Sequence, residues 1–234
     1  MIKKLFAITL GFLLALLVSE LVLRFSPVST GWENSPPSQN NPLIRYIHLA
    51  NFTYSRGWRF ENTVRGRFNN YGYVSQHHYD AMRRSIVFIG DSYTEAAMVS
   101  DGDRAHERVH KRLSPERQVI SLGQVGADLA DCLVAARFAA QNFDVESIVF
   151  LLNAGDFSKA SKEKIRGFWF ARDENNVVVI KSAAKIDARN LFYSSSLLSY
   201  IYGNLKFSPD DLWASCGLEK ATMKLVVSTS HQKA

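Results

Sequence analysis

A serine that directly follows a hydrophobic strand is the first candidate for chemistry in this sequence. The stretch SIVFIGDSYTE (85–95) runs from apolar Ile86–Ile89 straight into Gly90-Asp91-Ser92. Gly, Asp and Ser are ordinary turn residues, so a plain turn is one interpretation of this tripeptide. Open α/β sheets, however, place their ligands at the carboxyl ends of their strands. If this strand lies in such a sheet, Ser92 lies where these sheets place their chemistry.

Two later apolar stretches end in residues of the same kind. QVISL (118–122) is followed by Gly123 and Gly126, and SIVFLL (147–152) is followed by the polar stretch Asn153 to Asp156. The segment between them (127–142) has apolar residues at helical spacing. Strands that alternate with helices predict a parallel sheet, in which the carboxyl ends of the strands share one edge. We therefore expect the three polar strand ends to meet.

Residues 66–160 resemble the SGNH, or GDSL-like, hydrolase superfamily. Asn69-x-x-Gly72 resembles the lead-in of its membrane-anchored members, and Gly90-Asp91-Ser92 resembles its first block. VISLGQVGADLAD (119–131) resembles the second block, and IVFLLNAGDF (148–157) resembles the third. The resemblance implies a three-layer α/β sandwich with a parallel sheet, of the SGNH-hydrolase or flavodoxin-like kind. It also implies a serine esterase or acyltransferase that needs no cofactor and no metal.

The resemblance assigns a role to each strand end. Ser92 would be the nucleophile, and the amides of Ser92 and Gly126 with the side chain of Asn153 would form the oxyanion hole. Gly90, Asp91 and Asp156 would support these loops, Asp91 by hydrogen bonding rather than as a base. The third block departs from the family pattern, because Gly155 instead of Asn precedes Asp156 and the asparagine lies two residues earlier. The third donor is therefore present only if Asn153 turns its amide toward the site.

A serine nucleophile needs a general base, normally a histidine oriented by an acid. The superfamily supplies both in a C-terminal Asp-x-x-His, and only Asp103 and His106 have that spacing here. They fall on an expected helix (103–113) outside the sheet, with Ala105, Val109 and Leu113 on one face, so we interpret them as a solvated helix start. His231 is late enough to be the base but lacks the acid. Anchored relatives continue with another strand and the missing loop, so the chain is expected to be incomplete at its C-terminus.

The first 25 residues predict a membrane anchor. Lys3 and Lys4 precede an apolar run, Leu5–Leu23, which would be about 28 Å long as a helix, close to the hydrocarbon thickness of a bilayer. Glu20 lies near the end of this run, where its carboxylate can reach the headgroups. The two lysines favour a cytoplasmic N-terminus, which would place the rest of the chain on the extracytoplasmic, periplasmic side.

A cleaved signal peptide is the alternative to an anchor, but Leu17 and Ser19 fit the small-residue cleavage pattern poorly. Residues 26–43, rich in Pro, Ser and Asn, are expected to be a spacer that lifts the domain off the membrane. The hydrolase-like domain is expected over 44–234. Within it we expect a hairpin at 167–182 and helices at 190–205 and 210–227.

Composition excludes several functions. The net charge is +6 over 234 residues and no dense Lys/Arg block occurs, so nucleic acid is not an expected partner. Cys132 and Cys216 form no metal motif, and the sequence leaves open whether they pair. The expected function is a membrane-anchored ester hydrolase or O-acyltransferase that acts on surface carbohydrate or lipid esters. A catalytically inactive relative that binds glycan or a partner protein is the alternative.

Overall fold

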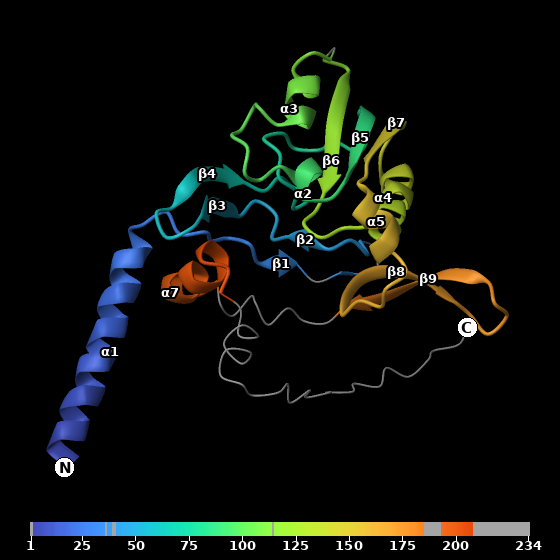
Figure 1. Ribbon diagram of the computed structural model, residues 1–234. Coiled ribbons are helices and arrows are strands. Elements are labelled where there is room, and N and C mark those ends of the chain that lie inside the picture. Colours follow the sequence, from blue (N-terminus) through green and yellow to red (C-terminus); the bar gives the residue numbers. More distant parts are fainter. Residues whose placement is uncertain (1, 36, 39–40, 114, 185–192, 208–234) are drawn as a thin grey trace.

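A parallel sheet of three strands lies at the centre of the molecule. The computed structural model describes residues 2–35, 37–38, 41–113, 115–184 and 193–207. In it, β5 (Arg84–Gly90) lies between β6 (Arg117–Gly123) and β7 (Val145–Leu151), with all three strands parallel. The register places Gly90 opposite both Gly123 and Leu151, so the three strands end together at one edge (Figure 1). The predicted mixed α/β class with a parallel sheet is confirmed.

Helices pack on both faces of β6. The long helix α4 (Leu129–Asn142) covers one face, where its Cys132 and Phe138 belong to the same buried core as Val87 and Ile120. The short helix α2 (Ser92–Glu95) lies on the opposite face, because the Ser121 hydroxyl contacts it there and neighbouring side chains of a strand point to opposite faces. The helix α3 (Ala105–His110) also packs against β6.

Strand β7 is less buried than its apolar sequence suggests. Phe150 and Leu151 are exposed, and within the described ranges only β5 pairs with this strand. The apolar stretch 147–152 would suggest a buried strand, and the structure does not bear this out. A run of apolar residues shows that a strand can lie in a core. It does not show that other elements cover both faces of that strand and pair with both of its edges.

The segment before the sheet builds a second, smaller core. Antiparallel pairs form between β1 (Asn34–Ser35) and β2 (Arg45–Tyr46), and between β3 (Asn51–Arg56) and β4 (Glu61–Arg67). In the region expected to be a spacer, Val28 and Leu43 are buried, and Thr30 pairs with Thr53. The described residues of 26–43 therefore belong to the folded body and do not stand clear of it.

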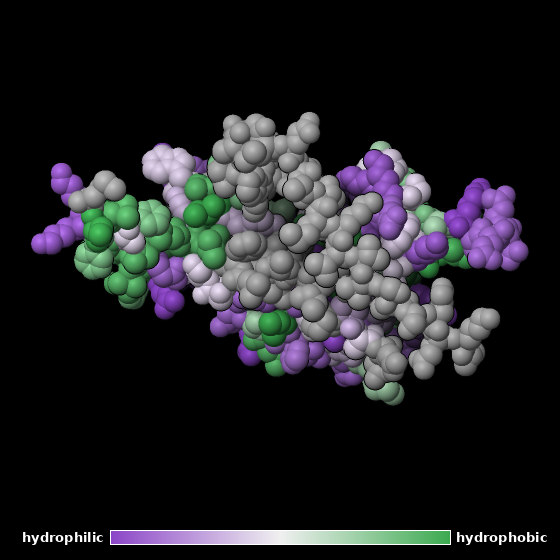
Figure 2. Space-filling model, turned by 90° about the horizontal axis from the view of Figure 1, so that it is seen from below, coloured by the Kyte–Doolittle hydropathy of each residue, from purple (hydrophilic) through white to green (hydrophobic). Residues whose placement is uncertain are grey.

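The N-terminal helix α1 (Ile2–Arg24) projects from one end of the body (Figure 1). None of its residues is buried, and it is long and apolar enough to cross a membrane. Seen from below, hydrophobic residues cover it at the left of the molecule (Figure 2). Its last turns lie beside α7 (Ser196–Ser199), which continues into the π-helical turn η1 (Tyr200–Asn204).

The remaining expected elements are found only in part. The hairpin is present as β8 (Arg166–Arg172) and β9 (Val178–Ala184), and a short helix α5 (Ala154–Lys159) follows β7. The helix expected at 190–205 is divided into α7 and η1. The helix expected at 210–227, with Cys216 and His231, lies outside the described residues. Cys132 is a free, buried thiol.

Candidate functional site

Ser92 is the first residue of α2 and directly follows the end of β5. Asp91 is the N-cap of this helix, and its Oδ1 accepts the Tyr93 N–H at 2.9 Å. Gly90 has no room for a side chain, since a Cβ atom would lie 2.2 Å from Thr94 Oγ1. The glycine thus lets the chain turn from the strand into a helix that packs close to it. This turn leaves the partly exposed Ser92 at the carboxyl edge of the sheet.

Asn153 connects the third strand end to the first. Its Oδ1 accepts the Gly155 N–H at 2.8 Å and caps α5, while its Nδ2 donates to Asp91 Oδ2 at 3.0 Å. Asp156 completes the cap by accepting the backbone N–H of Asn153 at 2.9 Å. The amide of Asn153 therefore turns toward the residue next to Ser92. A side-chain amide has two N–H donors, so one is left for a substrate oxygen.

The second strand end forms a turn against the first. Gln124 N–H donates to the Gly90 carbonyl at 3.1 Å, and Ala127 N–H donates to the Gln124 carbonyl at 3.1 Å. Gly126, inside this turn, has a φ of +78°, which favours glycine. Within the described part of the chain, the amides of Gly126 and Ser92 donate no hydrogen bond. An oxyanion is stabilised by backbone N–H groups that are free to donate to it, and these two amides at neighbouring strand ends are free in this way.

A buried acid, Glu95, joins the helix of Ser92 to the turn of Gly126. Its Oε1 accepts the Tyr46 hydroxyl at 2.8 Å, and the backbone N–H of Val125 is near enough to lower its pKa. Burial nevertheless raises the pKa of Glu95 to about 7. With its Oε1 bonded to Tyr46, Glu95 is placed to hold the two segments together rather than to take a proton from Ser92.

Helix α2 also packs closely against the end of β6. A Cβ atom on Gly123 would lie 2.2 Å from the Glu95 backbone nitrogen, so α2 rests directly on this glycine. Glycine is therefore needed at position 123 because backbone meets backbone there. The distance between the helix of Ser92 and the second strand end is fixed by this contact.

The Asn69-x-x-Gly72 loop positions Tyr46 for its bond to Glu95. The buried Oδ1 of Asn69 accepts two backbone N–H groups of its own loop, at 2.9 and 3.0 Å. The Gly72 carbonyl accepts the Tyr46 N–H at 3.1 Å. Gly72 has a φ of +82°, and a Cβ atom there would lie 2.3 Å from the Tyr46 carbonyl oxygen. The loop thus acts on the site indirectly, through Tyr46 and Glu95.

His106 belongs to a cluster on α3, the helix that packs against β6, where its Nε2 lies 3.6 Å from Glu107 Oε1. On the same helix, His110 accepts the Val119 N–H at 3.2 Å through Nδ1. Val119 lies four residues before Gly123 in β6, which is roughly 13 Å from the carboxyl edge at the rise of a strand. Asp103 is exposed, as expected, but His106 is only 3 % exposed, so the expectation of a solvated residue is wrong for His106.

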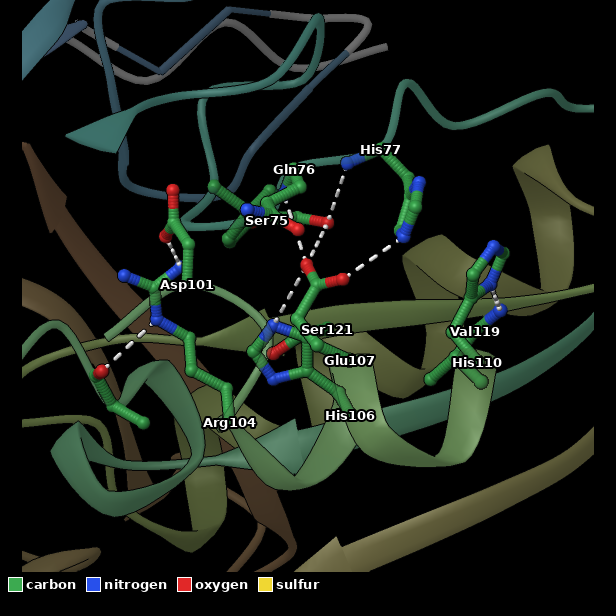
Figure 3. Close-up of polar contacts among 12 residues, drawn as sticks. Ser75, Gln76, His77, Asp101, Arg104, His106, Glu107, His110, Val119 and Ser121 are labelled. Atoms are coloured by element: carbon green, nitrogen blue, oxygen red, sulfur yellow. Dashed lines mark hydrogen bonds and ion pairs between the residues drawn. The ribbon is translucent and has the colours of Figure 1, made fainter. Parts of the chain in front are cut away.

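The cluster around Glu107 explains why this face of α3 is buried. Fully buried Glu107 accepts the Ser75 hydroxyl and the Gln76 N–H, each at 2.9 Å, and pairs with His77 Nε2 at 2.9 Å (Figure 3). Burial lowers the pKa of His106 to about 4. Through these contacts, Glu107 of α3 binds residues 75–77, which precede β5. Within the described ranges, no histidine interacts with Ser92, and His231 lies outside them.

A cavity of about 320 Å³ lies between the β8–β9 hairpin and the chain around Ile44. Ile44 and Phe168 line it and also line a small cavity that includes Gly90 and Gln124. The two cavities are therefore neighbours, with Ile44 and Phe168 between the edge of the sheet and the hairpin side. Trp169 is buried, so of the hairpin aromatics it is Phe168 that faces this space.

Sequence reasoning missed Glu95 and Tyr46. The available signal was an acid three residues after Ser92, so on the same side of a helical turn, within the otherwise small and apolar stretch that ends at Met98. Comparison of the chain with protein-family models, with curated proteins and with solved structures finds no match. What the chain can do is therefore inferred from its residues and their geometry.

Proposed function

We propose that this chain is a membrane-anchored, SGNH-like ester hydrolase or O-acyltransferase that works through an acyl-serine at Ser92. The observation that supports this is the meeting of three strand ends. Asp91, next to Ser92, is bonded to Asn153, and the turn of Gly126 is bonded to Gly90. Helices on both faces of β6 agree with a three-layer sandwich of the SGNH kind.

In the proposed reaction Ser92 Oγ attacks the carbonyl carbon of an ester. Its proton passes to a general base and then to the leaving alcohol, while the amides of Ser92 and Gly126 and the Nδ2 group of Asn153 stabilise the oxyanion. Water or an acceptor hydroxyl then releases the acyl group from Ser92, which gives hydrolysis or transfer. His231, outside the described residues, stays the predicted base, and Asp91, Gly90 and Asp156 support the loops.

The proposed substrate is a carbohydrate or lipid ester on the extracytoplasmic side of the membrane. The length and apolar character of α1 support anchoring, and Lys3 and Lys4 before it support a cytoplasmic N-terminus. Ile44 and Phe168 in the larger cavity offer an apolar wall to an acyl chain or to a sugar face. Protease added to right-side-out membrane vesicles should digest the domain, and protection would place it on the cytoplasmic side.

A non-catalytic relative that binds glycan or a partner protein is the second candidate. One observation favours it, because no described histidine interacts with Ser92. Removing one member of a catalytic triad leaves only the contribution of binding and of the oxyanion hole.

Hydrolysis of p-nitrophenyl acetate by the full chain in detergent separates the two candidates. We expect Ser92→Ala to abolish turnover, whereas Ser100→Ala, a change at an exposed serine, should leave it as in the wild type. A fluorophosphonate probe should label Ser92 and not the Ser92→Ala variant. Equal rates for Ser92→Ala and the wild type, without labelling, would refute catalysis and favour the binding protein.

A further inference from the structure

Glu20, near the end of α1, caps the first turn of α7. Its Oε2 accepts the Ser195 hydroxyl at 2.8 Å and the Leu197 N–H at 2.9 Å, and its Oε1 accepts the Ser196 N–H at 3.0 Å. Oε1 also accepts Arg24 Nε at 3.0 Å. The capped residues lie about 175 positions later in the chain. The anchor is therefore fixed to the body by side-chain contacts as well as by the chain itself.

The position of Glu20 along α1 sets the depth of this contact. The apolar part before it, Leu5–Ser19, is about 22 Å long at the helical rise, less than the roughly 30 Å of bilayer hydrocarbon. With Lys3 and Lys4 in one headgroup region, Glu20 therefore lies inside the hydrocarbon, close to its opposite boundary. A carboxylate at this depth is costly unless it is hydrogen-bonded. Because α7 supplies those bonds, its first turn lies at the same depth.

Exposed apolar side chains surround this contact and come from three separate segments. Phe25, directly after α1, is 85 % exposed, and Trp58, in the turn between β3 and β4, is 70 % exposed. The Arg59 guanidinium lies 5.4 Å from the Trp58 ring centroid. Figure 1 shows α7 and the β3–β4 end of the body beside the last turns of α1. The surface, named here the collar, consists of Phe25, Trp58, Arg59, Leu198, Leu205 and Phe207.

Buried Asn204 holds the segments of the collar together. Its Oδ1 accepts the N–H of Ser29, which follows α1, at 2.8 Å, and its Nδ2 donates to Ser55 Oγ at 2.7 Å. Its backbone carbonyl accepts the N–H of Gly57, next to Trp58, at 3.0 Å. These bonds hold the three segments that carry the collar in a fixed position relative to the end of α1.

We propose that the collar lies on the lipid bilayer that α1 crosses, with Trp58 at the level of the headgroups. This inference rests on the anchoring proposed above. Tryptophan is enriched at membrane interfaces, and basic side chains near the surface are attracted to anionic lipids. Exposed Arg56, Arg59 and Lys206 supply that charge. Contact through both α1 and the collar sets the tilt and the distance of the domain relative to the membrane.

Fluorescence quenching in vesicles tests the contact with the full chain. The vesicles contain phosphatidylcholine, phosphatidylglycerol and a phospholipid that carries a spin label close to its headgroup. We expect the wild type to lose a part of its tryptophan emission that Trp58→Phe does not lose. The matched control is Trp58→Phe combined with Met82→Trp, because Met82 is 87 % exposed and lies just before the amino end of β5. Emission of the introduced tryptophan should persist.

Flotation of the vesicles after an alkaline carbonate wash tests anchoring separately. Flotation together with quenching confined to Trp58 supports the collar. Flotation with no more quenching at Trp58 than at position 82 overturns the collar and leaves the anchor in place. A wild-type chain that does not float overturns both the anchor and the collar.

Discussion

Glu95→Gln should make the protein more stable than the wild type above pH 7, by an amount that grows as the pH rises from about 5 to 8. Burial raises the pKa of Glu95 from 4.5 to about 7, so the folded protein keeps a proton that the unfolded chain releases. This contribution to stability is complete below pH 4.5 and is lost as the pH rises through 7. At 1.36 kcal/mol per pKa unit, the loss is about 3 kcal/mol. Glutamine avoids it, because its neutral amide oxygen can still accept from the Tyr46 hydroxyl.

Thermal unfolding of the full chain in neutral detergent, from pH 5 to pH 9, measures this effect. For a chain of this size 1 kcal/mol corresponds to about 2–4 °C in Tm. We expect Glu95→Gln to unfold about 6–12 °C above the wild type at pH 8, with a small difference at pH 5. Glu163→Gln, at an exposed carboxylate, serves as the control and should follow the wild-type profile.

Two results would contradict this reasoning about Glu95. Parallel pH profiles for the wild type and Glu95→Gln would mean that the carboxyl group does not change charge in this range. A lower Tm for Glu95→Gln at pH 8 would mean that the surroundings of this carboxyl group depend on a negative charge rather than on a hydrogen-bond acceptor.

Three further substitutions test contacts near the strand ends and the collar. Gly123→Ala brings a Cβ atom within 2.2 Å of a backbone nitrogen, and urea unfolding should show a loss of about 1–3 kcal/mol or more. Asn153→Ala removes the cap of α5, which should cost about 1 kcal/mol in the same assay, and it should lower ester turnover on the order of 10²-fold. Asn204→Ala leaves a buried backbone N–H without its acceptor and should lower the free energy of unfolding by about 1–3 kcal/mol.

The strands of the central sheet were predictable because their signal is local. Each is a short apolar run bounded by glycine or polar residues, and the helix between two of them begins at Asp128, whose side chain accepts the Ala130 N–H at 3.0 Å. The hairpin was predictable for the same reason, since Asp173 and its neighbours form a turn between two apolar arms. Local hydrogen bonding and side-chain spacing decide these elements without distant partners.

The polar interior could not be predicted, because distant partners decide it. Periodicity favoured Ala105 as a buried residue of α3, but Ala105 is exposed and the neighbouring Glu107 is buried. Glu107 finds its hydrogen bonds on Ser75, 32 residues earlier. Glu95 likewise depends on Tyr46, 49 residues earlier. A charged residue is interpreted as solvated when its partner is not visible in the local sequence.

Asp91 gives one carboxylate oxygen to each of two chain segments, Oδ1 to the start of α2 and Oδ2 to Asn153. Because one rigid carboxylate links them, a displacement of the helix that carries Ser92 also displaces Asn153. A new substrate geometry could therefore not be reached by moving the nucleophile or the third donor alone. Adaptation at this edge would require paired substitutions that shift both segments by the same amount.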